Sequence, residues 1–311
     1  MTLPLGELAA LGAATCWAFT SLLFTFGGRR VGSQVVNLTR LLIAAVVLIT
    51  LHRLTLGAWL PFAAAPDRWS WLALSGLIGL VLGDAALFQT LIFLGPRLGA
   101  LMMALAPIIA TVAAWLFLSE RLAWVDLLAI VLAVGGVAWV VAERRPRAPV
   151  ALPAIGAMPE PVGNRNFAWG VLLGVGAATG QALGLITSRL GMYDDFPVIS
   201  ATVIRMLAAT LILWVLAAAT GRAARPFRAL ALDRRAAAAI GLASLIGPVL
   251  GVYLSLVAIQ HAPVGIASTL MALTPVVVLP LVRVLHRERI SPRAVLGTII
   301  ALAGVALIFL I

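Results

Sequence analysis

Long apolar runs recur along the whole chain and are separated by short connectors that contain charged residues, glycine and proline. Because an α-helix rises about 1.5 Å per residue, about 20 apolar residues cross a hydrocarbon core about 30 Å thick. Strands of a membrane barrel would be shorter and would alternate apolar and polar positions, which these runs do not. The pattern predicts ten transmembrane helices, at residues 5–26, 33–52, 70–93, 97–118, 122–142, 167–189, 196–220, 236–260, 264–285 and 291–311.

The composition agrees with a membrane protein. Of the 311 residues, 63% are hydrophobic and 11% are charged, whereas a typical soluble domain is about 45–50% apolar and about 25% charged. This argues against a water-soluble enzyme, a disordered chain and a nucleic-acid-binding protein. We therefore expect an all-α polytopic membrane protein whose partners are the lipid bilayer and a small-molecule substrate, as a monomer or a homodimer.

The second half of the chain repeats the first. A shift of 168 residues aligns Met-Ala-Leu-Ala-Pro at 103–107 with Met-Ala-Leu-Thr-Pro at 271–275, and Glu-Arg at 120–121 with Glu-Arg at 288–289. Small apolar residues match easily by chance, so the proline and Glu-Arg matches carry most of the weight. Repetition over half the chain indicates a fold assembled from two copies of one unit.

Five predicted spans lie in each copy. An odd number of spans inverts the second copy in the membrane, and inverted repeats of secondary transporters usually place the substrate site near the midplane between them. We expect one repeat at 1–142, a proline-rich linker at 143–166 and a second repeat at 167–311. The linker prolines are Pro146, Pro149, Pro153, Pro159 and Pro161.

Several short motifs follow one another in a fixed order, and some of them recur in both copies. They are the run Gly-Ala-Ala-Thr-Cys-Trp that ends at Trp17, Arg40 and Arg205 in the second span of each copy, Pro107 and Pro275 in mid-span, the Glu-Arg pairs at Glu120 and Glu288, and the Gly-Gly-Val run at Gly135. In this order the chain resembles bacterial permeases with two EamA-type domains, which belong to the drug/metabolite transporter superfamily. The resemblance implies a transporter of small metabolites, amino acids among them, rather than an enzyme.

Polar, aromatic and sulfur-containing side chains at mid-span depth are the candidates for binding a substrate. Asp84 is a carboxylate in mid-span, where burial of its charge costs about 2.5–3.5 kcal/mol unless it is paired, protonated or hydrated. Methionine adapts to varied apolar ligands. The predicted substrate-binding residues are Trp17, Asp84, Met103, Gln181, Tyr253 and Met271. Packing is the alternative role for the tryptophan and the methionines, and a structural polar pair is the alternative for Asp84.

Arg40, Asp84 and Arg205 are the candidates for gating or coupling. Both arginines lie about two turns inside their spans, where a long side chain can reach the headgroups. The alternative is an ion pair at a gate or contact with a substrate carboxylate. Pro107 and Pro275 each remove a backbone hydrogen bond, so both are predicted to kink a helix that lines the cavity.

No cofactor or metal site is predicted, because the three histidines are scattered and no catalytic motif is present. The leading hypothesis is export of amino acids or related metabolites by alternating access. One alternative is a phosphate- or nucleotide-sugar-type exchanger, which would need more basic residues in the cavity. The other is an intramembrane lipid-handling enzyme, which would need a catalytic partner for Asp84.

The basic residues suggest an orientation. All 22 of them are arginines; sixteen lie in or at the edges of the connectors that follow odd-numbered spans, and four lie in or at the edges of the others. The positive-inside rule assigns the arginine-rich face to the cytoplasm. We therefore expect a multi-pass protein of the bacterial inner membrane with both termini outside the cytoplasm, whereas relatives are usually drawn with both termini inside.

Overall fold

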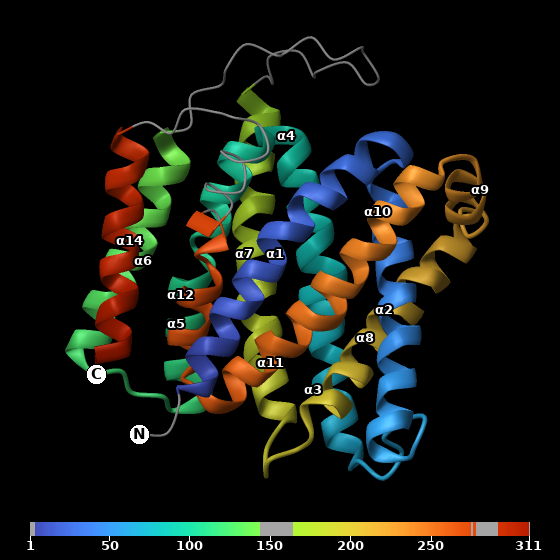
Figure 1. Cartoon of the computed structure of the whole chain (residues 1–311), viewed down its shortest axis with the longest axis horizontal. Helices are drawn as coiled ribbons and strands as arrows, with labels where there is room; N and C mark the ends of the chain where they lie inside the picture. Colours follow the sequence, from blue (N-terminus) through green and yellow to red (C-terminus); the bar gives the residue numbers. More distant parts are fainter. Residues whose placement is uncertain (1–3, 144–163, 275, 278–291, 311) are drawn as a thin grey trace.

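The computed structural model describes residues 4–143, 164–274, 276–277 and 292–310, and all regular secondary structure in these ranges is helical (Figure 1). The first half contains α1 (Leu5–Val31), α2 (Ser33–Leu56), α3 (Pro66–Ser75), η1 (Gly76–Gly83), α4 (Asp84–Met103), α5 (Ala106–Leu118) and α6 (Trp124–Glu143). The second half contains α7 (Asn164–Gly191), α8 (Val198–Ala219), α9 (Arg225–Leu232), α10 (Arg234–Ser244), η2 (Leu245–Gly251), α11 (Val252–His261), α12 (Val264–Met271) and α14 (Pro292–Leu310).

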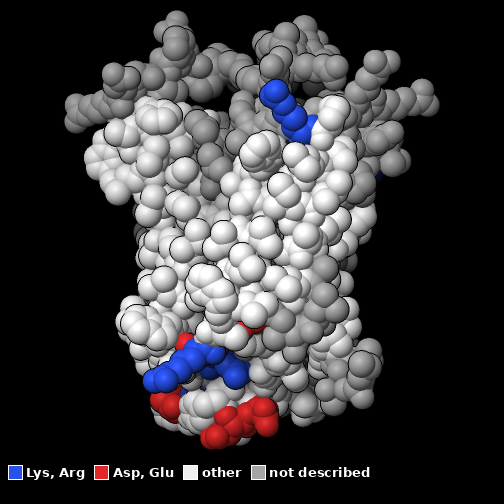
Figure 2. All heavy atoms as spheres, turned by 90° about the vertical axis from the view of Figure 1, so that its left-hand side faces the viewer, with Lys and Arg blue, Asp and Glu red and all other residues white. Residues whose placement is uncertain are grey.

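Six helical segments in the described residues are long and apolar enough to cross a membrane: 5–28, 33–56, 66–90, 167–191, 198–219 and 234–261. Shorter apolar helices occupy 106–118, 124–139 and 295–304. Figure 2 shows that the middle of one side of the molecule is free of charged side chains among the described residues, as a lipid-facing surface requires. The all-helical, multi-pass membrane fold is therefore confirmed, and the count of ten spans stays a prediction because 264–285 lies partly outside the described residues.

One predicted boundary differs from the structure. The chain is helical through 94–96, where a connector was expected, and the helix is interrupted instead at Ala104–Leu105, between α4 and α5. Pro107 explains this, because it has no N–H to donate and its ring collides with the carbonyl of the residue four positions earlier, Met103. Correspondingly, α12 ends at Met271, four residues before Pro275, which itself lies outside the described residues.

The two halves interlock. Helix α1 packs along α10, η2 and α11 of the second half, and α7 packs along α3, η1 and α4 of the first (Figure 1). Helix α1 begins at the same end of the molecule at which α14 finishes (Figure 1). An even number of membrane crossings requires this. The first long helix of each half is therefore buried against the third span of the other half.

The contact between α6 and α14 is reciprocal. A Cβ atom on Gly136 would lie 2.4 Å from the backbone nitrogen of Ala301, and a Cβ atom on Gly304 would lie 2.5 Å from the backbone nitrogen of Ala133. Gly136 and Ala133 become Gly304 and Ala301 after the same shift of 168 residues. Gly136 thus contacts Ala301, and the equivalent Gly304 contacts the equivalent Ala133. This is the contact pattern of a two-fold interface.

Gly136→Ala is expected to lower the stability of the protein by about 1–3 kcal/mol, because its Cβ would press on the backbone of α14. The matched control is Gly135→Ala in the same helix, where a Cβ meets no atom within 4 Å. Thermal unfolding in detergent measures both variants, and equal melting temperatures would contradict this description of the interface.

Candidate functional site

A cavity of about 610 Å³ lies between the two halves, within the range of about 300–1,000 Å³ usual for small-molecule sites. Its lining comes from α1, α2, η1, α4 and α5 of the first half and from α7, α8, α11 and α12 of the second. It extends to Gly28 and Ser33, where α1 meets α2. We call this the open end, and the opposite end, where α3 begins and α7 ends, the closed end.

The structure brings most of the predicted residues together. Trp17, Asp84, Met103, Gln181 and Met271 from the predicted substrate-binding set line the cavity, together with Arg40, Arg205 and Pro107. Tyr253 is not among the lining residues and packs instead against the hydrophobic core. Pro275 lies outside the described residues.

Arg40 and Asp84 form an ion pair in the cavity wall. Arg40 Nη2 donates a hydrogen bond to Asp84 Oδ2, and its Nε donates to Asn37 Oδ1 at 2.9 Å, one turn earlier in α2. The guanidinium carbon lies 6.0 Å and 5.8 Å from the ring centroids of Phe24 and Phe88. With 7% of its surface exposed, Arg40 is held inside the protein by its acidic partner and does not reach toward the headgroups.

Asp84 follows a wide helical turn that has a counterpart in the other half. In η1 the N–H of Asp84 bonds the carbonyl of Gly79, five residues earlier, and in η2 the N–H of Val252 bonds that of Gly247. Pro248 inside η2 lacks the N–H that a regular turn needs. Turns of this kind occur frequently at functional sites, and here one directs the only carboxylate in the described lining into the cavity.

Arg205 is 2% exposed, and its Nε and Nη1 have no hydrogen-bond partner among the described residues. Glycines make room for its guanidinium, because Cβ atoms on Gly79 and Gly184 would lie 2.8 Å and 3.3 Å from Nη2. Asp84 attracts it electrostatically but is hydrogen-bonded to Arg40. The two repeat-related arginines therefore differ: Arg40 is paired, whereas Arg205 is buried without a salt-bridge partner in the described chain.

Polar contacts hold the closed end together. Ser75 Oγ donates to the carbonyl of Gly184 at 2.6 Å and lies 2.6 Å from Ser188 Oγ, which joins α3 to α7. His52 Nε2 lies 2.9 Å from Ser200 Oγ, which joins α2 to α8. These four side chains are buried, so both contacts are shielded from water.

Glu120 adds a further link at the closed end. Its Oε2 accepts a hydrogen bond from the backbone N–H of Val264 at 2.9 Å, so the carboxylate caps the start of α12 from the other half. Burial raises the pKa of Glu120, and the Val264 N–H and the Arg189 charge oppose that shift. Glu120 thus links the segment after α5 to the start of α12.

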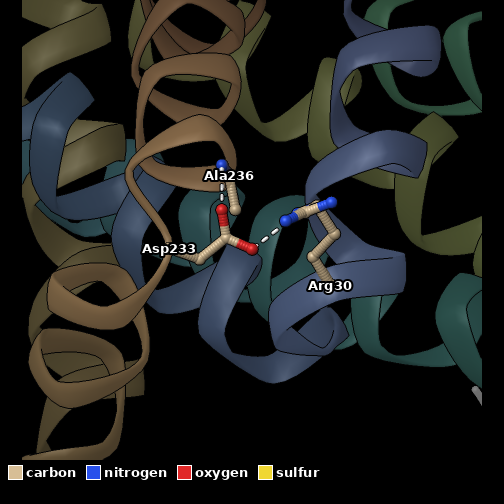
Figure 3. A network of polar contacts seen from close by, with 3 residues as sticks. All are labelled: Arg30, Asp233 and Ala236. Carbon is tan, nitrogen blue, oxygen red and sulfur yellow. Dashed lines mark hydrogen bonds and ion pairs between the residues drawn. The ribbon is translucent and has the colours of Figure 1, made fainter.

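The open end has an exposed link between α1 and α10. Asp233 Oδ1 accepts from the N–H of Ala236 at 3.0 Å and caps α10, while its Oδ2 pairs with Arg30 Nε at 2.5 Å (Figure 3). The Arg30 side chain is 43% exposed, and an ion pair open to water contributes about 0–1 kcal/mol. This described contact is thus weaker than the buried contacts at the closed end.

Some lining residues lie outside the predicted set, above all Phe24 and Phe88 beside Arg40. In a chain with 11 phenylalanines, nothing local separates a phenylalanine that faces a cavity from one that faces lipid. The glycine pairs Gly79/Gly83 and Gly247/Gly251 were visible in the sequence, but the same spacing is typical of plain helix packing.

Fold and cavity together define a multi-pass membrane protein with an internal cavity large enough for a small molecule. A profile of the EamA-like transporter family matches the chain twice, at residues 4–142 and 168–310, and the chain belongs to that family. The double match agrees with the repetition in the sequence. No curated protein matches the chain.

A solved crystal structure, described only as that of a protein, has the same fold. It superimposes with a TM-score of 0.75 at 17% sequence identity and covers 98% of this chain and 96% of its own. At this identity the likeness extends to the fold alone.

Proposed function

We propose that this protein is a secondary transporter that exports small metabolites, amino acids or related compounds, by alternating access. The observation that carries the proposal is the asymmetry of the cavity in the described residues: it reaches Gly28 and the exposed Ser33 at one end, while buried polar contacts hold the other end together. A carrier in one of its two states has this asymmetry, since a substrate must enter from one side before it leaves from the other.

The repeats supply a route to the opposite state. In the proposed scheme the two halves are inverted copies, so the helices that close one end have counterparts that can close the other. Gly83 packs against Gly180, and the equivalent Gly251 packs against Cys16. Small residues at such crossings let the helices approach closely and present smooth surfaces for small movements.

The arginine distribution favours export. The open end carries the connector between α1 and α2, which belongs to the arginine-rich set that the positive-inside rule assigns to the cytoplasm. The cavity would then load from the cytoplasm. A tag placed at the C-terminus tests the orientation, because protease added outside intact cells removes it only if that terminus is outside the cytoplasm.

Counterflow in proteoliposomes tests the transport function. Purified protein is reconstituted with a panel of unlabelled amino acids inside, and uptake of the labelled compound is measured with and without a proton gradient. We expect exchange of amino acids with apolar or aromatic side chains, since most of the lining is apolar. Absence of exchange for every amino acid would contradict the predicted substrate class.

A further inference from the structure

The charges around the cavity do not cancel. Among its described lining residues only Arg40, Asp84 and Arg205 are charged. Arg40 and Asp84 neutralise each other through their ion pair. Arg205 stays protonated at any physiological pH, so this part of the lining carries a net charge of one positive unit, located on Arg205.

The remaining positive charge, on Arg205, lies in the protein interior, where an unpaired charge is energetically unfavourable. Arg205 is almost fully buried, and two of its nitrogens lack acceptors within the described chain. An uncompensated buried charge and buried donors without acceptors both raise the free energy of the empty protein. A ligand that brings one negative charge and acceptor oxygens would relieve both costs.

We propose that the cavity recognises small monocarboxylates with an apolar or aromatic body, and that Arg205 is the residue that binds the carboxylate. The proposal rests on the transport function above and narrows its substrate class: an amino acid still binds through its carboxylate, but a monocarboxylate with the same body binds more tightly. The recognised group is the carboxylate rather than an amino group. An amino acid brings an ammonium group as well, and Asp84, the only carboxylate in the described lining, is occupied by Arg40.

The rest of the wall suits the body of such a ligand. Trp17, Phe24 and Phe88 supply aromatic surface, and Met103 and Met271 supply adaptable apolar surface. Carboxylate binding by arginine is bidentate and strong when water is excluded. Arg205 lines the cavity while its Nε and Nη1 lie buried without acceptors among the described residues, so the proposal requires the guanidinium to rotate toward the cavity when a carboxylate binds.

Four probes that share one phenyl ring test the proposal: 3-phenylpropionate, phenylalanine, phenethylamine and phenyl phosphate. Binding to the purified full-length protein is measured by calorimetry at one pH and one ionic strength. We expect 3-phenylpropionate to bind most tightly and phenethylamine to bind at least about tenfold more weakly, because its charge is repelled by Arg205. Equal or tighter binding of phenethylamine, or tighter binding of phenyl phosphate than of 3-phenylpropionate, would overturn the proposal.

Two substitutions change the cavity charge in opposite directions. Arg205→Gln removes the charge and is expected to abolish the preference for 3-phenylpropionate over phenethylamine. Asp84→Asn leaves both arginines uncompensated and is expected to widen that preference. A site in which Asp84 binds an amino group predicts instead that Asp84→Asn weakens phenylalanine selectively, and that result would contradict our assignment.

Arg205→Lys is the matched control, because it keeps the charge but not the planar fork. We expect it to preserve the order of the four probes with weaker absolute affinity. If Arg205→Gln does not fold, the opposite outcomes expected for Asp84→Asn still decide the question.

The experiments distinguish a failure of the proposed carboxylate site from a failure of the proposed transport function. Binding of 3-phenylpropionate that depends on Arg205, without counterflow of any probe, would support the site and contradict the transport function. Counterflow that runs equally well with phenethylamine and 3-phenylpropionate would support transport and overturn the proposed recognition of a carboxylate.

Discussion

Arg40→Met is expected to destabilise the protein by about 3–5 kcal/mol, whereas Arg205→Met is expected to be neutral or stabilising. The first substitution leaves the half-buried Asp84 carboxylate without its hydrogen-bonded partner, and it also removes the hydrogen bond to Asn37. The second removes a buried guanidinium that has no salt-bridge partner in the described chain. Thermal unfolding of the ligand-free protein in one detergent measures both.

The two arginines occupy equivalent positions in their halves, so each variant serves as the control for the other. The double variant Arg40→Met with Asp84→Leu removes both charges and is expected to recover most of the lost stability, as an apolar pair often can. Equal destabilisation by Arg40→Met and Arg205→Met would contradict the difference in pairing that underlies the substrate proposal.

Gly180→Ala is expected to lower stability by about 1–3 kcal/mol and to abolish substrate exchange. Its Cβ would lie 2.9 Å from Gly83 Cα and 3.1 Å from the carbonyl oxygen of Ile78, and both of these atoms belong to the backbone. Gly180 and Gly83 directly precede the cavity residues Gln181 and Asp84. Forcing α7 away from η1 therefore displaces two sides of the site at once.

Gly176→Ala is the matched control for that substitution. Gly176 lies one turn earlier in α7, where a Cβ would meet no atom within 4 Å. Its melting temperature and its counterflow rate should equal those of the unsubstituted protein. A Gly180→Ala variant that retains full exchange would show that this crossing tolerates separation and would remove it from the transport scheme.

The repeated motifs made much of the site predictable from the sequence. Trp17 and Gln181 follow the same run, Gly-Ala-Ala-Thr, at 12–15 and 176–179, and both line the cavity. The same logic placed Met103 and Met271 together. Tyr253 was chosen for its depth and its polar tip alone, and depth does not determine which way a side chain points around a helix.

The pairing of Arg40 with Asp84 was not predictable. The two residues are 44 positions apart in different helices, and only the wide turn of η1 brings the carboxylate to α2. A π-type turn arises from strain and packing that leave no distinctive local pattern, since η2 contains a proline and η1 contains none. The sequence likewise did not predict that Arg205 has no salt-bridge partner among the described residues, because this depends on whether Asp84 pairs with Arg40 or with Arg205.

The most direct test of alternating access uses two cysteines in a Cys16→Ala background, since Cys16 is the chain's only cysteine. Ser33→Cys is exposed at the open end, and Ser188→Cys is buried at the closed end. A bulky maleimide is attached to Ser33→Cys from its own side, and labelling of Ser188→Cys is then followed from the other side of the membrane. We predict that Ser188→Cys is labelled while Ser33→Cys is unmodified. Once the maleimide on Ser33→Cys keeps the open end from closing, we predict that labelling of Ser188→Cys stops. Labelling of Ser188→Cys at the same rate before and after the block would contradict alternating access through this cavity.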